Sequence, residues 1–194
     1  PIRADFNLFE DEGFAYNFWE GRLNVAEVKD SKLDYVLVPF SVNGFRITSF
    51  SPSKKVSGSF TKLYLGSNVV SVGENTVYLS SNFSSLREIN VDPANKFLTA
   101  YKNVLYNIGN DAPYFIPSAI TKLELKPVKV IEKNFIYHLE NVEEIVFAEG
   151  TERIEAYAME KCRNLRKVYV PSSVTYMDKD AIYDCGNDVE IIRK

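Results

Sequence analysis

A repeat of 23 residues in the C-terminal half constrains the fold more than any other feature of this sequence. Two segments align at this offset, one beginning at Ile145 and the other at Val168, and the residues between the matched positions vary freely. Stacked coils produce such a pattern, because each coil buries its apolar face only against its neighbours. The sequence therefore predicts a solenoid whose core columns hold Ile145 and Val168, Phe147 and Val170, Ile154 and Met177, Ala158 and Ala181, and Cys162 and Cys185.

The same spacing extends towards the N-terminus with decreasing regularity. Residues 63–65 and 86–91 resemble strands, with Leu63 and Leu86 again 23 residues apart, and residues 37–50 resemble a further coil that contains an insertion. The strand at residues 123–125 precedes Ile145 and is one residue out of register. One step back from the aligned segments, the columns of Ile154, Ala158, Cys162 and Leu165 continue with Ile131, Phe135, Leu139 and Val142.

Within one coil the apolar period changes from that of a strand to that of a helix. Residues 165–170 alternate as a short strand that ends at Pro171, and residues 178–185 have helical spacing. An acidic residue opens the helical piece in three coils, where it would cap the unpaired N–H groups of a helix; these acids are Glu132, Glu155 and Asp178. The predicted fold is therefore α/β: a solenoid with a parallel β-sheet on its concave face and short helices or turns on its convex face.

The rest of the chain is expected to complete one domain over residues 1–194. Two strands around a turn at Glu20-Gly21 predict a β-hairpin in residues 1–34, which would cap the N-terminal end of the core. The repeats are expected over residues 35–192. Between Asp92 and Pro117 the period breaks, which predicts a hairpin inserted at about 93–116.

At this point the residues show a family resemblance. The unit at residues 165–177 reads Leu-x-x-Val-x-Val-Pro-x-Ser-Val-x-x-Met, and Ala181-Ile182-x-x-Cys185 follows it. This unit resembles the BspA-type leucine-rich repeat, and residues 38–50 and 89–107 are similar to the first repeat and the inserted hairpin of such proteins. The resemblance covers roughly residues 13–192. It implies a leucine-rich-repeat solenoid of a bacterial surface or secreted protein that binds host, matrix or cell-surface ligands, and it supplies no catalytic residues.

Composition limits the classes of partner. The formal net charge is -3, so no strongly basic field is available to hold a nucleic acid, which we do not expect as a partner. No apolar run approaches the roughly 20 residues of a membrane-spanning helix. The chain opens at Pro1 with a polar, acidic segment, and no signal peptide is visible. The resemblance implies an extracellular or cell-surface location, with the signal or anchor sequence removed from this chain, and we expect a monomer.

The sequence offers little material for catalysis or metal binding. Its single histidine, His138, falls in the column of Lys161 and Asp184, which are expected to lie on the surface. Cys162 and Cys185 fall in a core column and are expected to be free buried thiols, because packed helices lie about 8–10 Å apart and a disulfide needs Cα atoms within about 7 Å. A disulfide remains the alternative. We expect no catalytic, cofactor-binding or metal site, and no cofactor.

The candidate ligand-binding surface is the outer face of the parallel sheet. Strand alternation places aromatic and charged residues there in two columns, and curved solenoids commonly bind extended partners on this face. The first column is Tyr64, Asn90, Glu124, Val146 and Tyr169, and the second is Lys62, Glu88, Lys122, Glu144 and Lys167.

Three functions are consistent with this surface. The first is a non-enzymatic adhesion or recognition module that binds a protein or a glycan through the concave sheet, with the inserted hairpin as a possible second contact. The second is a structural spacer or stalk of a larger surface protein, in which the same face is a solvated sheet stabilised by cross-strand charges. The third, and least favoured, is a carbohydrate-active enzyme, because adjacent acids such as Glu143 and Glu144 usually mark a solvated face.

Overall fold

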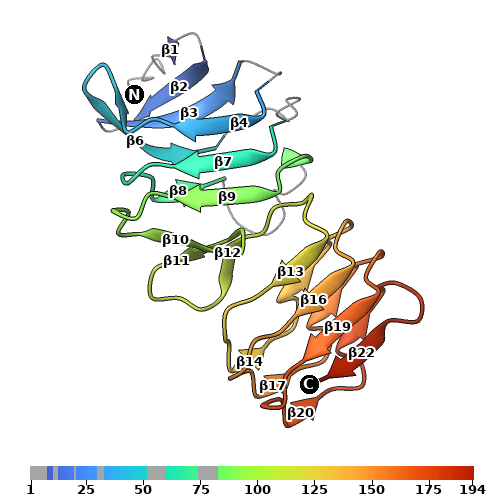
Figure 1. Ribbon diagram of the computed structural model, residues 1–194. Coiled ribbons are helices and arrows are strands. Elements are labelled where there is room, and N and C mark those ends of the chain that lie inside the picture. The colour runs from blue at the N-terminus through green and yellow to red at the C-terminus, as the bar shows by residue number, and fades with distance from the viewer. Residues whose placement is uncertain (1–7, 11–12, 20, 30–32, 52–59, 74–82) are drawn as a thin grey trace, which may run out of the picture.

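The computed structural model describes residues 8–10, 13–19, 21–29, 33–51, 60–73 and 83–194. These residues form a β-solenoid of about seven turns, and they contain strands and turns but no α-helix. Figure 1 shows the N-terminal coils and the C-terminal coils as two stacks whose strands run in different directions, with strands β10, β11 and β12 between them.

The strands are short and follow one another with few residues between them. The N-terminal half holds β1 (Leu8–Glu10), β2 (Phe14–Trp19), β3 (Arg22–Val28), β4 (Tyr35–Val38), β5 (Ser41–Val42), β6 (Phe45–Phe50), β7 (Lys62–Leu65), β8 (Ser71–Val72) and β9 (Glu88–Val91). The insertion holds β10 (Leu98–Tyr101), β11 (Val104–Asn107) and β12 (Pro113–Phe115). The C-terminal half holds β13 (Lys122–Glu124), β14 (Val130–Ile131), β15 (Ile136–Tyr137), β16 (Glu144–Val146), β17 (Arg153–Ile154), β18 (Met159–Glu160), β19 (Lys167–Val170), β20 (Tyr176–Met177), β21 (Ile182–Tyr183) and β22 (Glu190–Arg193).

Each coil of the C-terminal half has three strands, and equivalent strands of successive coils pair in parallel. The three resulting sheets are β13-β16-β19-β22, β14-β17-β20 and β15-β18-β21. Leu123 lies opposite Ile145, and Ile145 lies opposite Val168. The predicted 23-residue register is therefore confirmed for this half, as is the one-residue offset of the strand at Leu123.

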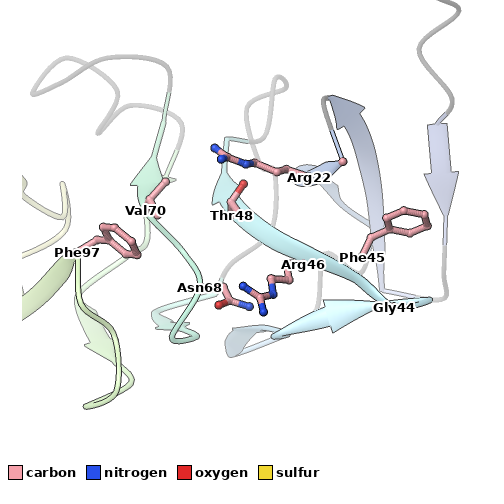
Figure 2. Close-up of a pocket in the computed structure, with 9 residues that line it drawn as sticks. Arg22, Gly44, Phe45, Arg46, Thr48, Asn68, Val70 and Phe97 are labelled. Atoms are coloured by element: carbon pink, nitrogen blue, oxygen red, sulfur yellow. The ribbon is translucent and has the colours of Figure 1, made fainter.

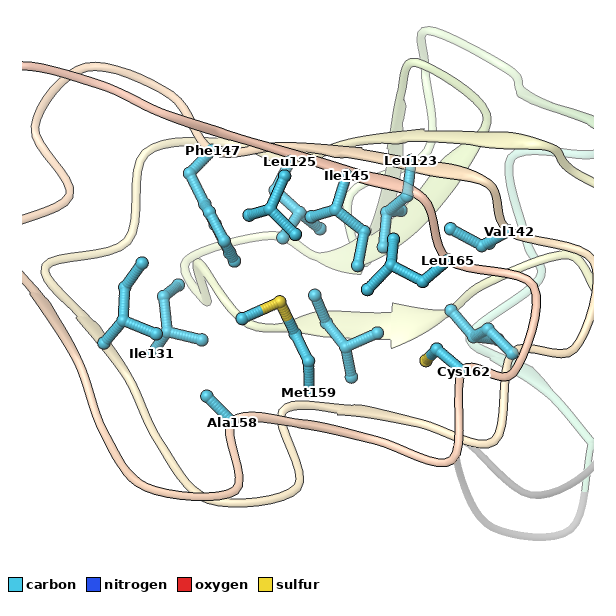
Figure 3. Close-up of a cluster of buried hydrophobic side chains, with 14 of the residues drawn as sticks. Leu123, Leu125, Ile131, Val142, Ile145, Phe147, Ala158, Met159, Cys162 and Leu165 are labelled. Carbon is cyan, nitrogen blue, oxygen red and sulfur yellow. The ribbon is translucent and has the colours of Figure 1, made fainter. Parts of the chain in front are cut away.

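The core of the C-terminal half is built from the predicted columns. Figure 3 shows these side chains pointing into the space between the three sheets. Ile145, Ile154 and Val168 are completely buried, as are Ala158 and Cys162. Full burial of one such aliphatic side chain stabilises the fold by about 1.5–3 kcal/mol, and the repeat supplies several to every coil.

The predicted helices are wrong: the structure has strands β15, β18 and β21 in their place. The three acids predicted as helix caps open tight turns instead, and Asp178 accepts a hydrogen bond from the backbone N–H of Asp180 (2.8 Å). Apolar positions three or four residues apart also occur when a turn is followed by a two-residue strand, which explains the error. The described residues contain no helix long and apolar enough to span a membrane.

At the corners of the C-terminal coils, residues other than glycine adopt left-handed backbone angles. His138, Lys161 and Asp184 recur at the same coil position with φ between 48° and 59°, a region that costs an L-residue about 1–2 kcal/mol. The backbone N–H of His138 donates to the carbonyl of Glu160 (2.9 Å), and that of Lys161 donates to Tyr183 (3.1 Å). These hydrogen bonds between coils hold the unfavourable backbone angle.

The N-terminal half has the parallel sheet β4-β7-β9 and a six-stranded mixed sheet, in which β3 and β8 both pair in parallel with β6. The predicted hairpin is present as antiparallel strands β2 and β3, but its description as a separate cap is not supported. Strand β3 pairs in parallel with β6, and its Leu23 and Val25 belong to the core of the coils. The predicted equivalence of Leu63 with Leu86 is also wrong, because Leu63 pairs with Ile89.

The inserted segment forms an antiparallel meander of β10, β11 and β12. Its central strand is buried on both faces. Leu105 packs in the N-terminal core, whereas Val104 and Tyr106 pack in the C-terminal core. The meander therefore separates the two cores and is shared by both.

Candidate functional site

The predicted ligand-binding residues lie on two sheets and do not form one continuous face. Lys62 and Tyr64 on β7 pair with Glu88 and Asn90 on β9 in the N-terminal sheet. The remaining predicted residues belong to the C-terminal sheet, and the meander interrupts the stack between β9 and β13 (Figure 1). In the C-terminal sheet Lys122, Glu144 and Lys167 form one outer column, and Glu124, Val146 and Tyr169 form the other.

The outer face of the C-terminal sheet carries a column of alternating charges and a tyrosine ring that a lysine covers. Positive and negative side chains alternate along the column from Lys122 to Glu190, an arrangement that stabilises neighbouring strands by tenths of a kcal/mol to about 1 kcal/mol per pair. The ammonium group of Lys194 lies over the ring of Tyr169, 4.8 Å from its centroid. Tyr169 therefore presents a ring that is already covered by a cation.

The outer face of the N-terminal sheet is more apolar and more open. Tyr35 and Leu37 on β4 are 56% and 59% exposed, and they continue the columns of Lys62 and Tyr64. The rings of Tyr35 and Tyr64 meet edge to face with their centroids 6.4 Å apart. Around them lies a shallow hollow of about 290 Å³ that is also lined by Asp34.

Sequence reasoning missed Tyr35 and Leu37, although a signal for them exists. In β4 exposed Tyr35 and Leu37 alternate with buried Val36 and Val38. Two-residue alternation assigns Tyr35 and Leu37 to the solvent face.

Charged and polar side chains around this hollow are fixed by an ion pair and by hydrogen bonds. Lys62 Nζ lies 3.5 Å from Glu88 Oε2 across the sheet, and Asn90 donates a hydrogen bond to Glu88 (2.7 Å). The hydroxyl of Thr61 donates to the Asp34 carboxylate (2.9 Å). The hollow therefore combines an apolar floor with one cation and one carboxylate at its rim.

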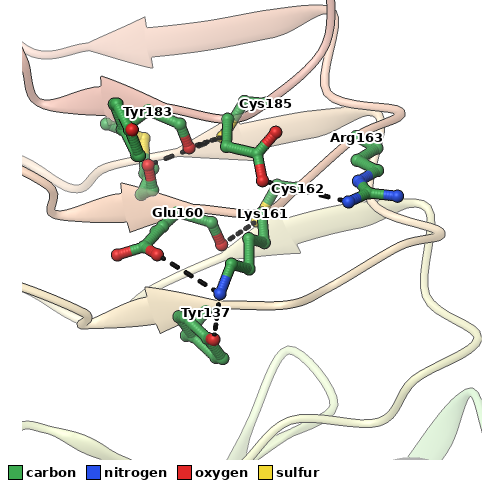
Figure 4. Close-up of polar contacts among 9 residues, drawn as sticks. Tyr137, Glu160, Lys161, Cys162, Arg163, Tyr183 and Cys185 are labelled. Carbon is green, nitrogen blue, oxygen red and sulfur yellow. Dashed lines mark hydrogen bonds and ion pairs between the residues drawn. The ribbon is translucent and has the colours of Figure 1, made fainter.

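His138 is exposed, as predicted, and its Nε2 lies 3.2 Å from Glu140 Oε1. Figure 4 shows the adjoining polar contacts, in which Lys161 donates to the hydroxyl of Tyr137 (2.6 Å) and forms an ion pair with Glu160 (3.6 Å). The hydrogen bond with Tyr137 raises the pKa of Lys161. The described residues contain no group of three or more side chains placed to hold a metal ion.

Cys162 and Cys185 are free thiols, as predicted, but only Cys162 is buried as expected, and the reason given for free thiols was wrong. They follow the paired strands β18 and β21 and do not lie on packed helices, so their coils are only about 4.8 Å apart. The thiol of Cys162 donates to the carbonyl of Glu160 (3.6 Å), and that of Cys185 contacts the carbonyl of Tyr183 (3.4 Å) (Figure 4).

The two thiols differ in burial and in acidity. Cys162 is completely buried, whereas Cys185 in the last coil is partly accessible. When Cys185 is ionised, the neighbouring thiol of Cys162 donates a hydrogen bond to its sulfur, which lowers the pKa of Cys185 to about 7. That hydrogen bond and the burial of its side chain raise the pKa of Cys162, so Cys185 is the more reactive thiol.

Two solved structures are similar to this chain, and the first of them supports the solenoid architecture. A leucine-rich repeat protein of Bacteroides ovatus is 14% identical, with a TM-score of 0.50 over 96% of this chain and 55% of that one. A leucine rich cell surface protein of Faecalibacterium prausnitzii is also 14% identical, with a TM-score of 0.45 over 96% of this chain and 50% of that one. The chain spans about half the length of these two proteins. No curated protein sequence matches it.

Comparison with protein families is more specific than these structural likenesses. The BspA type leucine rich repeat region matches residues 55–189 in six copies. The match spans most of the chain, including the three regular coils and the segment between β9 and β13. The chain belongs to the BspA-type leucine-rich-repeat family.

Proposed function

We propose that this domain is a non-enzymatic extracellular recognition module, which binds a protein or glycan of a cell surface or matrix through the outer face of its N-terminal parallel sheet. The contact residues are Tyr35, Leu37, Lys62 and Tyr64. A surface location is supported by the family and by the description of the Faecalibacterium prausnitzii protein as a leucine rich cell surface protein.

The observation that carries this proposal is the exposure of Tyr35 and Leu37 beside Tyr64 on a regular sheet. A strand that folds into a solenoid needs apolar residues only on its inner side, so the core does not account for these side chains. Exposed apolar clusters with a polar rim are typical of binding surfaces, and tyrosine is enriched where binding energy concentrates. The hollow around these side chains, at about 290 Å³, could take one side chain or one sugar ring.

An array of glycans and matrix proteins, probed with the intact chain, would identify the ligand class. Tyr64→Ala and Leu37→Ala should each weaken capture of the identified ligand by about tenfold or more, as expected for residues at the centre of an interface. Both variants should retain the unfolding temperature of the parent within a few degrees, because neither side chain enters the core.

Tyr169→Ala is the matched control on the other sheet. It removes the same side chain from an outer column, but from one where Lys194 covers the ring. Unchanged binding of Tyr169→Ala with weakened binding of Tyr64→Ala would assign the ligand to the N-terminal sheet. Equal losses would mean that the ligand spans both sheets, as the sequence suggested. Unchanged binding in all three variants, or hydrolysis of a glycan on the array, would overturn the proposal.

The spacer function is a second candidate, and the C-terminal half favours it. There, two outer tyrosines are engaged by cations of the same chain: Arg153 lies 4.3 Å from the ring centroid of Tyr176, and Lys161 lies 4.9 Å from that of Tyr137. Such a surface is stable without a ligand. We propose that the regular C-terminal coils support the N-terminal sheet and contribute little contact of their own.

A further inference from the structure

A larger hollow lies on a different face of the N-terminal half, over the sheet formed by β3, β6 and β8. Its volume is about 690 Å³, within the range of about 300–1,000 Å³ typical of small-ligand sites. Figure 2 shows its lining side chains, with Arg22 and Arg46 extending from neighbouring strands and Phe45 and Phe97 towards its two ends.

The strand register places the two arginines side by side. Leu23 on β3 lies opposite Ile47 on β6, and both are buried in the core. Arg22 and Arg46 each precede one of these residues and are both exposed, so they share the outer face of adjacent parallel strands. Strands in a sheet are about 4.8 Å apart, so the two cationic side chains leave the same face of the sheet from adjacent backbone positions.

Neither guanidinium group is neutralised within the part of the chain that the structure describes. Arg22 and Arg46 have no ion pair with a described residue, and no carboxylate is among the described residues that line the hollow. Other arginines of the chain, such as Arg153 and Arg166, do have carboxylate partners. Like charges on neighbouring strands destabilise a sheet, so an anion bound between Arg22 and Arg46 would remove a cost that the fold otherwise carries.

The walls of the hollow are apolar and well held. Phe45 packs edge to face on Phe18, with ring centroids 5.0 Å apart. Phe97 is 54% exposed, and its backbone N–H is held by the side chain of Asn95 (2.8 Å). Buried Asn95 also donates to the carbonyls of two residues of the preceding coil, Gly66 (2.9 Å) and Val69 (2.8 Å). This network fixes the Phe97 wall relative to the coil that carries Asn68 and Val70.

We propose that this hollow binds an anionic sugar, whose carboxylate or sulfate group lies between Arg22 and Arg46. A guanidinium group matches the planar oxygens of either anion with two parallel hydrogen bonds. Phe97 offers an apolar face to the sugar ring, and Thr48 and the amide of Asn68 supply polar contacts for its hydroxyl groups. The chain carries a net charge of -3, so the site attracts a compact anion by local contacts and does not hold a long polyanion.

The test uses the intact chain and four probes: trigalacturonic acid, a sulfated heparin disaccharide, neutral galactotriose and sodium sulfate. Titration calorimetry in a buffer without phosphate should show binding of at least one anionic sugar and no binding of galactotriose. The anionic sugar that binds identifies the recognised group as a carboxylate or a sulfate. Raising the salt concentration should weaken binding, because the arginines are exposed to solvent.

Variants assign the binding to this hollow. Arg22→Gln and Arg46→Gln should each weaken binding of the anionic sugar by about tenfold or more, and Phe97→Ala by several-fold. Arg87→Gln is the matched control, since it removes the same charge from an exposed position outside the hollow. Tyr64→Ala should leave this affinity unchanged, because Tyr64 lies on another sheet, and this result separates the site from the one proposed above.

Four results would overturn the proposal. The first is equal binding of galactotriose, which would exclude charge recognition. The second is sodium sulfate binding as tightly as the sulfated disaccharide, which would reduce the site to one for a simple anion. The third is an equal loss of affinity in Arg87→Gln, and the fourth is no binding of either anionic sugar. A further readout is thermal unfolding without ligand, in which Arg46→Gln should unfold at a temperature no lower than the parent chain, because it removes a charge repulsion.

Discussion

The two halves of the solenoid differ in how regularly their coils repeat. In the C-terminal half Glu144 pairs with Lys167, 23 residues further on, and every complete coil has three strands. In the N-terminal half Tyr35 pairs with Lys62, 27 residues further on, and the additional residues include the antiparallel excursion of β5 and β6. The longer coils carry exposed Tyr35 and Leu37, and they also carry Arg22 and Arg46. Regular coils thus supply the scaffold, and the departures from the repeat supply both candidate binding surfaces.

The halves also differ in how they turn corners. Among the described residues of the N-terminal coils, positive φ occurs only at Asn43 and at glycines, the residue types that tolerate it. The C-terminal coils place Tyr157, His138 and Lys161 in the same conformation and hold them with backbone hydrogen bonds between coils. Strict stacking can therefore impose a backbone conformation that the side chain disfavours, whereas the irregular coils rely on residue choice.

The largest effect is expected at the meander, where the two halves meet. Tyr106 is completely buried in the C-terminal core, and its hydroxyl accepts a hydrogen bond from the backbone N–H of Lys126 (3.2 Å). Tyr106→Ala should lower the free energy of unfolding by about 4 kcal/mol, as for other buried aromatic residues cut to alanine. Leu105→Ala, on the opposite face of β11, should cost about 3 kcal/mol.

Hydrogen exchange would show which half each variant loosens. Tyr106→Ala should accelerate exchange mainly in β13–β22, and Leu105→Ala mainly in β4–β9. The same exchange pattern in both variants would show that the halves unfold as one cooperative unit. In that case the difference between them is one of shape and not of stability.

The difference between the halves also explains how much the sequence could predict. Columns such as Leu139 and Cys162 recur at one offset, so the repeat places them in the core without further information. Helical spacing over residues 178–185 covers too few residues to distinguish a helix from a turn and a two-residue strand. The N-terminal register is hidden because Leu63 pairs with Ile89, 26 residues further on, while Leu86 lies by coincidence at the 23-residue offset.

The candidate sites were only partly predictable for a similar reason. Alternation correctly assigns Tyr64 and Tyr169 to outer faces, but it cannot show that the meander divides these faces into two sheets. The proximity of Arg22 and Arg46 depends on the pairing of β3 with β6, which joins segments that share no repeat signal.

Coil spacing can be compared directly at two glycines. A Cβ atom at Gly186, in the last regular coil, would lie 2.0 Å from the carbonyl oxygen of Leu165, which is backbone and cannot move aside easily. At Gly66, in the N-terminal half, the nearest atom would be 3.3 Å away. Gly186→Ala should cost about 3 kcal/mol, the upper part of the usual range for overpacking, and Gly66→Ala less than about 1 kcal/mol. Chemical denaturation measures both, and equal costs would contradict tighter stacking of the C-terminal coils.

A smaller effect concerns the thiols, which are found only in the C-terminal half. Because the pKa of Cys185 is lowered to about 7, its alkylation by iodoacetamide should reach half of its maximal rate near neutral pH. A free thiol ordinarily does so at about pH 8.5. Cys162 should remain unmodified while the chain is folded, since it is completely buried and the pKa of its thiol is raised.

Mass spectrometry of the alkylated peptides over pH 6–9 gives the reaction rates of both thiols. In Cys162→Ala the midpoint pH for alkylation of Cys185 should move upwards, because the hydrogen bond from Cys162 is lost. Equal reactivity of the two thiols would contradict the assignment.

The smallest effect tests whether stacking holds the corner of a coil in an unfavourable conformation. His138 has a φ of 56°, and its exposed side chain contacts Glu140 and the ring of Tyr137 at the surface, where an ion pair is worth little. His138→Gly should be more stable than His138→Ala by about 1 kcal/mol, because both variants lack the ion pair and only glycine tolerates the left-handed region. Part of this gain is offset by the greater freedom of glycine in the unfolded chain. Thermal unfolding of the pair measures the difference, and equal stability would mean that the backbone at His138 relaxes when the side chain is removed. The hydrogen bond from its N–H to Glu160 argues against such relaxation, because the next coil fixes the direction of that donor.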